Sequence, residues 1–226
     1  MIDTVTQDST LLAAILATML PFVAFVVIMV FTRKHRGLSA GLSIGAITVS
    51  LLSAIFLLAR HGHPEAPIQY LGRWLVSGDI HIPFGFLLDQ ASLLMLTIVT
   101  TISFLVQIYS LGYMAGDKGF SRYYAFMSLF AWAMMNLTIA PTMVQLFIFW
   151  ELVGLSSYLL IGFWYEKFSA TEAGKKAFVM TRFGDVAFFL GLLLALVNLG
   201  NLNILEMNSP GVSGRMSPFL ITMASL

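Results

Sequence analysis

The sequence contains no cysteine and only four histidines. The lack of cysteine excludes disulfides and any cluster or metal that needs thiolate ligands. Haem held by histidine is not excluded by this count, but His35, His61, His63 and His81 all fall between the long apolar runs rather than inside them. We therefore predict neither a metal site nor a cofactor site on this chain.

Charge of either sign is also scarce. Charged residues make up 10% of the 226 positions and hydrophobic residues 58%, whereas soluble domains carry about 25% charged residues. This composition predicts a protein embedded in a lipid bilayer. The net charge of +1 and the single basic run, Arg33-Lys34-His35-Arg36, argue against nucleic acid as a partner.

Long apolar runs predict an all-α polytopic membrane protein with six transmembrane helices. Each run has the roughly 17–25 residues that cross the hydrocarbon core at about 1.5 Å per residue. The predicted spans are residues 11–32, 38–59, 90–114, 122–140, 142–164 and 175–199. Ser217-Pro218 is typical of a helix start, so a seventh helix is expected to begin there. We accordingly expect residues 1–226 to be one membrane domain, the N-terminal fragment of a longer protein.

The segment between the second and third spans has a different period. Apolar residues alternate from Trp74 to Phe86, with an interruption at Ser77-Gly78-Asp79. Alternation with a glycine turn predicts a β-hairpin within residues 66–88. An irregular aromatic loop at the membrane surface is the alternative.

Lysine and arginine are unevenly divided between alternate loops. The loops after the first, third and fifth spans hold eight of them, and the opposite loops hold three. The positive-inside rule then places the N-terminus outside and the first set of loops in the cytoplasm. The hairpin and residues 200–217 are expected to be external.

Three ionisable residues lie within the predicted spans. Glu151 is the lone carboxylate of residues 149–164, and Arg182 and Asp185 lie three residues apart in the next span. Counted from the connecting loop, Glu151 lies about 18 Å deep, Asp185 about 15 Å and Arg182 about 10 Å. A charge at such depth costs at least about 2.5 kcal/mol, which makes each residue a functional candidate.

Further features of these two spans bear on that hypothesis. Lys175 and Lys176 stand nearer the surface and form, with Arg182, a cationic ladder leading inward. Gly154, Tyr158 and Gly162 share the helix face of Glu151, which predicts close approach of another helix or of water.

The same residues can also be explained by purely structural roles. Glu151 could be a protonated, inert hydrogen-bond partner, and Arg182 could simply neutralise Asp185 and lock two helices together. Asn136 and Gln107, single amides within their spans, are better explained as packing contacts.

Several motifs resemble one known family. F-W-E-L-V-G-L-S-S-Y-L-L-I-G-F-W at 149–164, K-K-A-F-V-M-T-R-F-G-D-V at 175–186 and F-L-L-D-Q-A-S-L-L-M-L at 86–96 resemble the amino-terminal half of the L subunit of bacterial respiratory complex I, NADH:quinone oxidoreductase. The resemblance covers nearly the whole chain.

The resemblance implies a proton-translocating, antiporter-like subunit of that enzyme in the bacterial inner membrane. Glu151 then corresponds to the family's essential fifth-helix glutamate, and Arg182 and Asp185 to its sixth-helix charged pair. The lysine that partners the glutamate would lie beyond Leu226. NAD, FMN, iron–sulfur clusters and quinone would be bound by other subunits of the complex, and other membrane subunits would be the partners.

Related functions stay open at this point. The same helices occur in the large subunit of multisubunit sodium/proton antiporters and in membrane subunits of related hydrogenases or inorganic-carbon uptake systems. A scaffold without transport, in which the buried charges are interhelical locks, is a further alternative.

Overall fold

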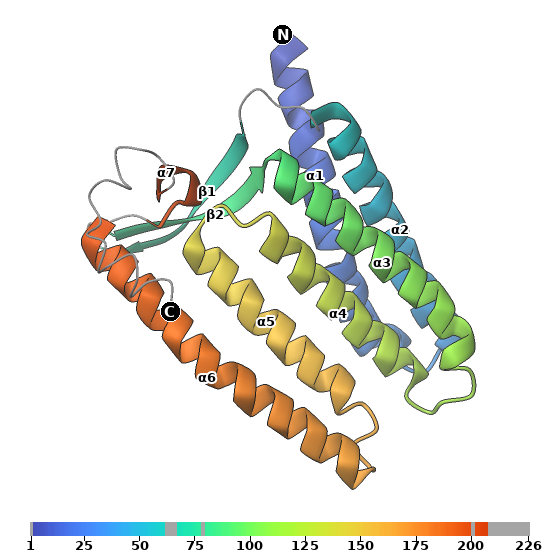
Figure 1. Cartoon of the computed structure of the whole chain (residues 1–226). Coiled ribbons are helices and arrows are strands. Elements are labelled where there is room, and N and C mark those ends of the chain that lie inside the picture. Colours follow the sequence, from blue (N-terminus) through green and yellow to red (C-terminus); the bar gives the residue numbers. More distant parts are fainter. Residues whose placement is uncertain (1, 62–66, 78–79, 200–201, 208–226) are drawn as a thin grey trace.

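Six long helices and one β-hairpin form the part of the chain that the computed structural model describes, residues 2–61, 67–77, 80–199 and 202–207 (Figure 1). The elements in chain order are α1 (Ile2–Val27), the π-helical turn η1 (Ile28–Thr32), α2 (Arg36–His61), β1 (Ile68–Ser77), β2 (Ile80–Leu88), α3 (Gln90–Tyr113), α4 (Phe120–Thr138), α5 (Met143–Ile161), α6 (Phe168–Leu199) and the short α7 (Ile204–Met207). The predicted helix start at Ser217-Pro218 lies outside the described residues.

Five stretches within the described residues are long and apolar enough to cross a membrane, where the sequence predicted six. They are Ser9–Thr32, Arg36–His61, Gln90–Tyr113, Met143–Ile161 and Phe168–Leu199. Helix α4 forms where the sequence predicted a span at 122–140, but it does not reach the same mean hydropathy.

The position of α4 explains its lower hydropathy. It packs against α1, α2, α3 and α5, and more than half of its residues are buried by the protein itself. Ser43 of α2 donates to Gln107 of α3 at 2.9 Å and lies 2.6 Å from the Ser128 hydroxyl of α4. Tyr124 of α4 donates to the Gln107 carbonyl at 2.8 Å. Polar side chains are tolerated here because they bond between helices and do not face lipid.

Two helices are longer than their apolar runs. α6 begins at Phe168, not at residue 175, and α1 begins at Ile2, not at residue 11. A hydropathy pattern indicates only the part of a helix that is suited to lipid. The helix itself can continue beyond that part, because its backbone hydrogen bonds do not depend on apolar side chains. Glu172 lies in these extra turns of α6 and pairs with the exposed Lys175 at 3.1 Å across an i, i+3 step.

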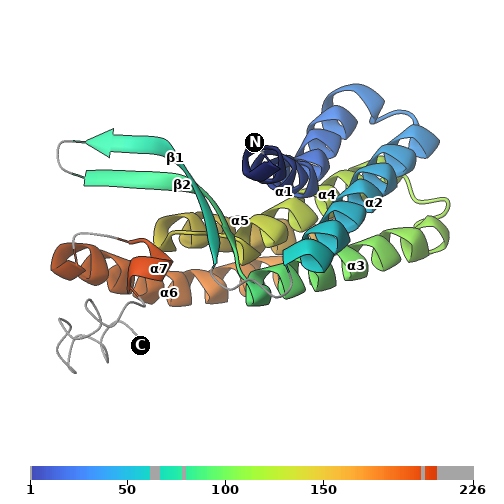
Figure 2. The same ribbon diagram turned by 90° about the horizontal axis from the view of Figure 1, so that it is seen from above.

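The predicted hairpin is confirmed as an antiparallel pair of strands, in register from Ile68 opposite Leu88 to Ser77 opposite Ile80, with an irregularity between Arg73 and Leu75. Its turn, residues 78–79, lies outside the described residues. The pair crosses one end of the bundle, from the start of α3 toward α7 (Figures 1 and 2).

One side chain fastens the hairpin to α5. The buried amide of Gln145 accepts from the Gly85 backbone N–H at 2.9 Å and donates to the Gly85 carbonyl at 3.0 Å. A Cβ at Gly85 would overlap the Tyr70 carbonyl of the facing strand, so glycine is required at this position. Gly85 therefore allows both the strand pairing and the attachment to the helix.

The loops joining α1 to α2, α3 to α4 and α5 to α6 all lie at the opposite end of the bundle (Figure 1). These are the loops in which the sequence concentrates lysine and arginine. The two ends of the bundle thus differ, with a hairpin at one and basic turns at the other.

Candidate functional site

The candidate site lies between α5 and α6, which run antiparallel and in contact (Figure 1). α5 starts at the N-cap residue Thr142, whose side chain accepts from the Gln145 N–H. Near the loop, a Cβ on Gly174 would meet the Gly162 backbone at 3.4 Å, and at mid-helix a Cβ on Gly154 would lie 3.7 Å from Arg182 Nη2. The small-residue face predicted on α5 is therefore the face that receives α6.

A single guanidinium contacts two carboxylates at this interface. Arg182 of α6 forms an ion pair through Nη1 with Glu151 Oε2 of α5, and the same Nη1 lies 3.4 Å from Asp185 Oδ2. Arg182 Nη2 is also 3.5 Å from the Glu151 carbonyl. The sequence predicted Glu151 and the Arg182/Asp185 pair separately, and the structure brings all three together.

The three residues stand near the middle of their helices. At 1.5 Å per residue, Glu151 lies about 12 Å from the first residue of α5 and about 15 Å from the last. Asp185 lies about 25 Å from the start of α6 and about 21 Å from its end. Two helices that are long enough to span a bilayer thus meet at a charged cluster close to their centres.

Two aromatic residues that the sequence reasoning missed complete the cluster. The indole Nε1 of Trp150 donates to Asp185 Oδ1 at 2.8 Å, and the Phe178 ring lies 4.4 Å from Arg182 Cζ. Phe178 precedes Arg182 by four residues, a spacing that places two side chains on one helix face. Trp150 contacts a residue of another helix, so no spacing within its own helix could have indicated the bond.

The charges of the cluster do not cancel. Its side chains are partly or largely withdrawn from solvent, with exposed fractions of 30% for Arg182, 26% for Glu151 and 10% for Asp185. One cation beside two carboxylates has a net charge of −1 when all are ionised, and a net charge at membrane depth is costly. Binding one proton on either carboxylate makes the cluster neutral. The arrangement is therefore chemically able to hold and release a proton.

The cluster borders a groove of about 600 Å³ between α4, α5 and α6. Trp150 and Gly154 of α5 and Asp185 of α6 are among its lining residues, and α4 contributes Met134 and Leu137. Asp185 is the one charged residue among the described residues of a largely apolar lining, so the cluster meets the groove through this carboxylate.

The two candidate lysines lie apart from the cluster. Lys175 and Lys176 are exposed near the loop end of α6, and Lys175 pairs with Glu172. Arg182 follows Lys175 by seven positions, which is about 10 Å along the helix axis. The structure places the two lysines at the exposed end of α6 and Arg182 at a partly buried position, and the ladder remains a prediction.

Comparison with known proteins gives two adjoining family matches. Residues 74–124 match the family described as NADH-ubiquinone oxidoreductase (complex I), chain 5 N-terminus, and residues 140–224 match the one described as NADH:quinone oxidoreductase/Mrp antiporter, TM.

Individual relatives agree with these matches. The chain is 44% identical over 163 residues to NAD(P)H-quinone oxidoreductase chain 5 of Picosynechococcus sp., an alignment that covers 72% of this chain and 24% of that protein. It is 33% identical over 210 residues to the chloroplastic subunit 5 of Nephroselmis olivacea, covering 93% of this chain and 32% of that one. The chain spans about a quarter of the length of the first of these relatives.

A solved structure supports the fold. A chain of the membrane-bound sulfane sulfur reductase, an archaeal respiratory membrane complex, superposes with a TM-score of 0.77 at 19% identity, covering 94% of this chain and 42% of that one. The two family matches and the identities to chain 5 agree: this chain, with its long apolar helices, is similar to the N-terminal part of the membrane subunit called chain 5 of NAD(P)H-quinone oxidoreductase.

Proposed function

We propose that this chain is part of a proton-translocating membrane subunit of an NAD(P)H:quinone oxidoreductase, and that Glu151, Arg182 and Asp185 carry the proton transfer. The observation that supports this most is the contact of one guanidinium with two carboxylates at the centre of two apolar helices. The two family matches support it independently.

In this proposal the arginine governs which carboxylate holds the proton. When Arg182 lies against Glu151, the proton resides on Asp185, and when Arg182 moves toward Asp185, the proton resides on Glu151. A cation approaching either carboxylate from another helix would favour proton release from it. In this proposal the cation is a lysine on another helix of the full-length subunit.

The redox reaction belongs to other subunits in this proposal. NAD, FMN, iron–sulfur clusters and quinone are bound there, and the partners of this chain are the other membrane subunits of the complex. The chain itself contributes coupled proton movement and carries no cofactor.

The proposed topology has six spans, with α4 as the fourth. The N-terminus and the hairpin are external, and the basic turns face the cytoplasm of a bacterial inner membrane. Lys175 and Lys176 then stand at the cytoplasmic surface, where they attract or relay protons toward the buried cluster.

The test is Glu151→Gln in the full-length subunit within its assembled complex. Glutamine keeps the size and hydrogen bonding of the side chain but cannot ionise, so we expect normal assembly with a lowered number of protons translocated per electron. Glu206→Gln, at an exposed position of the short helix α7, is the matched control and leaves this number unchanged. An unchanged ratio in the Glu151→Gln complex would refute the proposal.

A sodium/proton antiporter subunit is the second candidate, because one of the two family descriptions includes the Mrp antiporter. Sodium dependence distinguishes the two functions. Transport by the full-length protein that requires sodium and proceeds without quinone reduction would favour the antiporter.

A further inference from the structure

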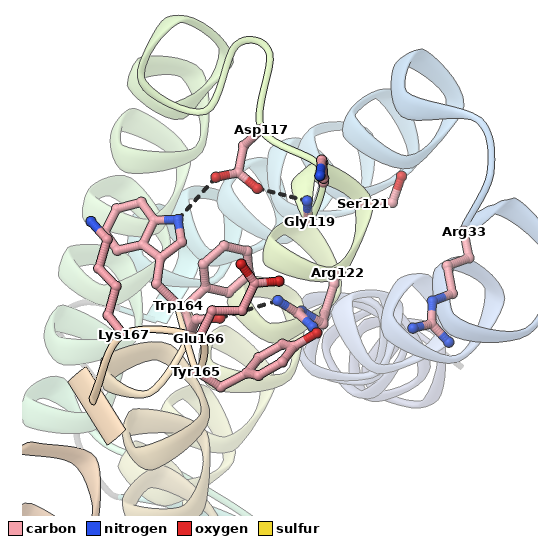
Figure 3. Close-up of a pocket in the computed structure, with 11 residues that line it drawn as sticks. Arg33, Asp117, Gly119, Ser121, Arg122, Trp164, Tyr165, Glu166 and Lys167 are labelled. Atoms are coloured by element: carbon pink, nitrogen blue, oxygen red, sulfur yellow. Dashed lines mark hydrogen bonds between the residues drawn. The ribbon is translucent and has the colours of Figure 1, made fainter. Parts of the chain in front are cut away.

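A second polar site lies away from the charged cluster, at the end of the bundle that carries the basic turns. A pocket of about 440 Å³ opens there between the turns that join α1 to α2, α3 to α4 and α5 to α6 (Figure 3). Its charged lining consists of four cations and two carboxylates: Arg33, Lys118, Arg122, Lys167, Asp117 and Glu166.

The positive charge of this pocket is not neutralised locally. Within the described part of the chain, none of the four cations lies within 4.0 Å of a carboxylate. Asp117 is already engaged, since it accepts from Trp164 Nε1 at 2.9 Å and from the Gly119 N–H at 2.6 Å. These two bonds, the Trp164 bond first, lower the pKa of Asp117, so it is ionised at neutral pH. Four cations against two carboxylates leave the pocket with a net charge of +2, which favours an anion.

Two donor groups are available beside this charge. The buried Ser121 hydroxyl, 5% exposed as a residue, and Arg122 Nε have no hydrogen-bond partner among the described residues. The Arg122 guanidinium is held in place, because it lies 4.8 Å from the Phe163 ring centre and 4.9 Å from that of Tyr165, and it donates to the Phe163 carbonyl at 3.1 Å. A fixed guanidinium is suited to phosphate oxygens.

The surroundings indicate an anion that is attached to an apolar body. A second pocket, of about 220 Å³, shares Arg122, Phe163 and Tyr165 with the first and continues over Phe126 and Leu159 of α4 and α5. The lining side chains Trp164 and Tyr165 are 41% and 61% exposed. Exposed tryptophan and tyrosine at a helix end are typical of the level of lipid headgroups.

We propose that this pocket binds the phosphodiester headgroup of an anionic phospholipid, with the glycerol backbone passing into the adjoining apolar pocket. The four cations attract the phosphate, Arg122 and Ser121 donate to its oxygens, and the lipid joins the turns of three helix pairs. Basic pockets between helices at the membrane surface are known to hold anionic headgroups.

The test uses phosphatidylglycerol with a photoreactive diazirine on its headgroup, added to the intact complex that contains the full-length subunit. After illumination, crosslinked peptides are identified by mass spectrometry. We expect crosslinks at residues 117–122 and 163–167, with unlabelled phosphatidylglycerol competing more strongly than phosphatidylcholine. Lys118→Gln lowers the yield about fivefold, from the attraction that one basic residue supplies near a membrane. Lys34→Gln changes an exposed lysine of the α1–α2 turn that does not line the pocket. It is the matched control, and we expect it to change the yield by less than twofold.

Other outcomes would overturn the proposal in distinguishable ways. Equal competition by inorganic phosphate would show a site for a soluble anion. Equal competition by phosphatidylcholine would show that the negative charge is not recognised. Equal yields from Lys118→Gln and Lys34→Gln would show that the lining cations do not hold the headgroup.

Discussion

Arg182 is the residue on which the arrangement of the candidate site depends. It contacts Glu151 on the neighbouring helix and Asp185 on its own, with Phe178 beneath it. Lysine could not make the same contacts. Its compact ammonium lacks the planar guanidinium shape that contacts two carboxylates and stacks on an aromatic ring at the same time.

The Trp150–Asp185 hydrogen bond gives a prediction at this scale. Trp150→Phe keeps an aromatic ring but removes the donor to a carboxylate, so we expect a loss of about 1.5–3 kcal/mol in the stability of the subunit. Trp132→Phe is the control, because the buried Trp132 Nε1 has no hydrogen-bond partner among the described residues. Thermal unfolding of the purified complex measures both. Equal transition temperatures for the two variants would show that the Asp185 bond contributes nothing.

The sequence identified the charged residues of the site because a charge is conspicuous in an apolar run. Glu151, Arg182 and Asp185 were predicted in this way, and their middle positions followed from the rise per residue. Their mutual contact could not be predicted, because spacing relates residues of one helix and gives no rotation of α5 against α6. The Trp150 contribution was missed for the same reason.

At the scale of elements, variants of the charged residues between α5 and α6 can distinguish a role in proton transfer from a structural role that only holds the two helices together. Arg182→Leu alone leaves two carboxylates without their cation and is expected to cost about 3–5 kcal/mol. Arg182→Leu/Asp185→Leu leaves only Glu151, which becomes neutral with one proton, so assembly should recover.

The measurement is proton translocation by the assembled double variant, with amounts of complex normalised. We expect poor translocation despite recovered assembly, because neutrality is restored but the second proton-accepting group is absent. Normal translocation would identify the Arg182/Asp185 pair as a lock between helices.

The hairpin offers a prediction about a single backbone position. Gly85→Ala places a methyl group against the Tyr70 carbonyl and separates Gly85 from Gln145. Each buried group left without its bond costs about 1–3 kcal/mol, so β1 should detach more often and trypsin should cleave faster after Arg73. Gly112→Ala in α3, where a Cβ meets nothing within 4 Å, is the control. Unchanged cleavage in Gly85→Ala would contradict the proposed role of this glycine.

Among the elements, the apolar runs and the alternating segment predicted every long helix and the hairpin. The early start of α6 was missed because Ser169, Thr171 and Glu172 interrupt the apolar pattern without interrupting the helix. The central position of α4 was also hidden, because a helix surrounded by protein has no lipid-facing stripe to reveal it.

For the whole molecule, the proposed topology is tested by labelling. The chain has no cysteine of its own, so single cysteines at Ser169, near the start of α6, and at Leu71, in β1, can be labelled with an impermeant thiol reagent. We expect Leu71→Cys to react from outside intact cells and Ser169→Cys only after the membrane is opened. Reaction of both from the same side would contradict the six-span arrangement.

The polar residues of α4 also determine the order in which this bundle can be inserted into a bilayer. Ser128 can form its hydrogen bond with Ser43, and Tyr124 its bond to the Gln107 backbone carbonyl, only when α2 and α3 are already beside α4. A helix that needs such partners is unstable alone in lipid. The more apolar helices α1, α2 and α3 can each enter the bilayer separately. We therefore expect the translocation machinery to retain α4 until α2 and α3 are in place, and α5 and α6 to join a bundle that is already formed.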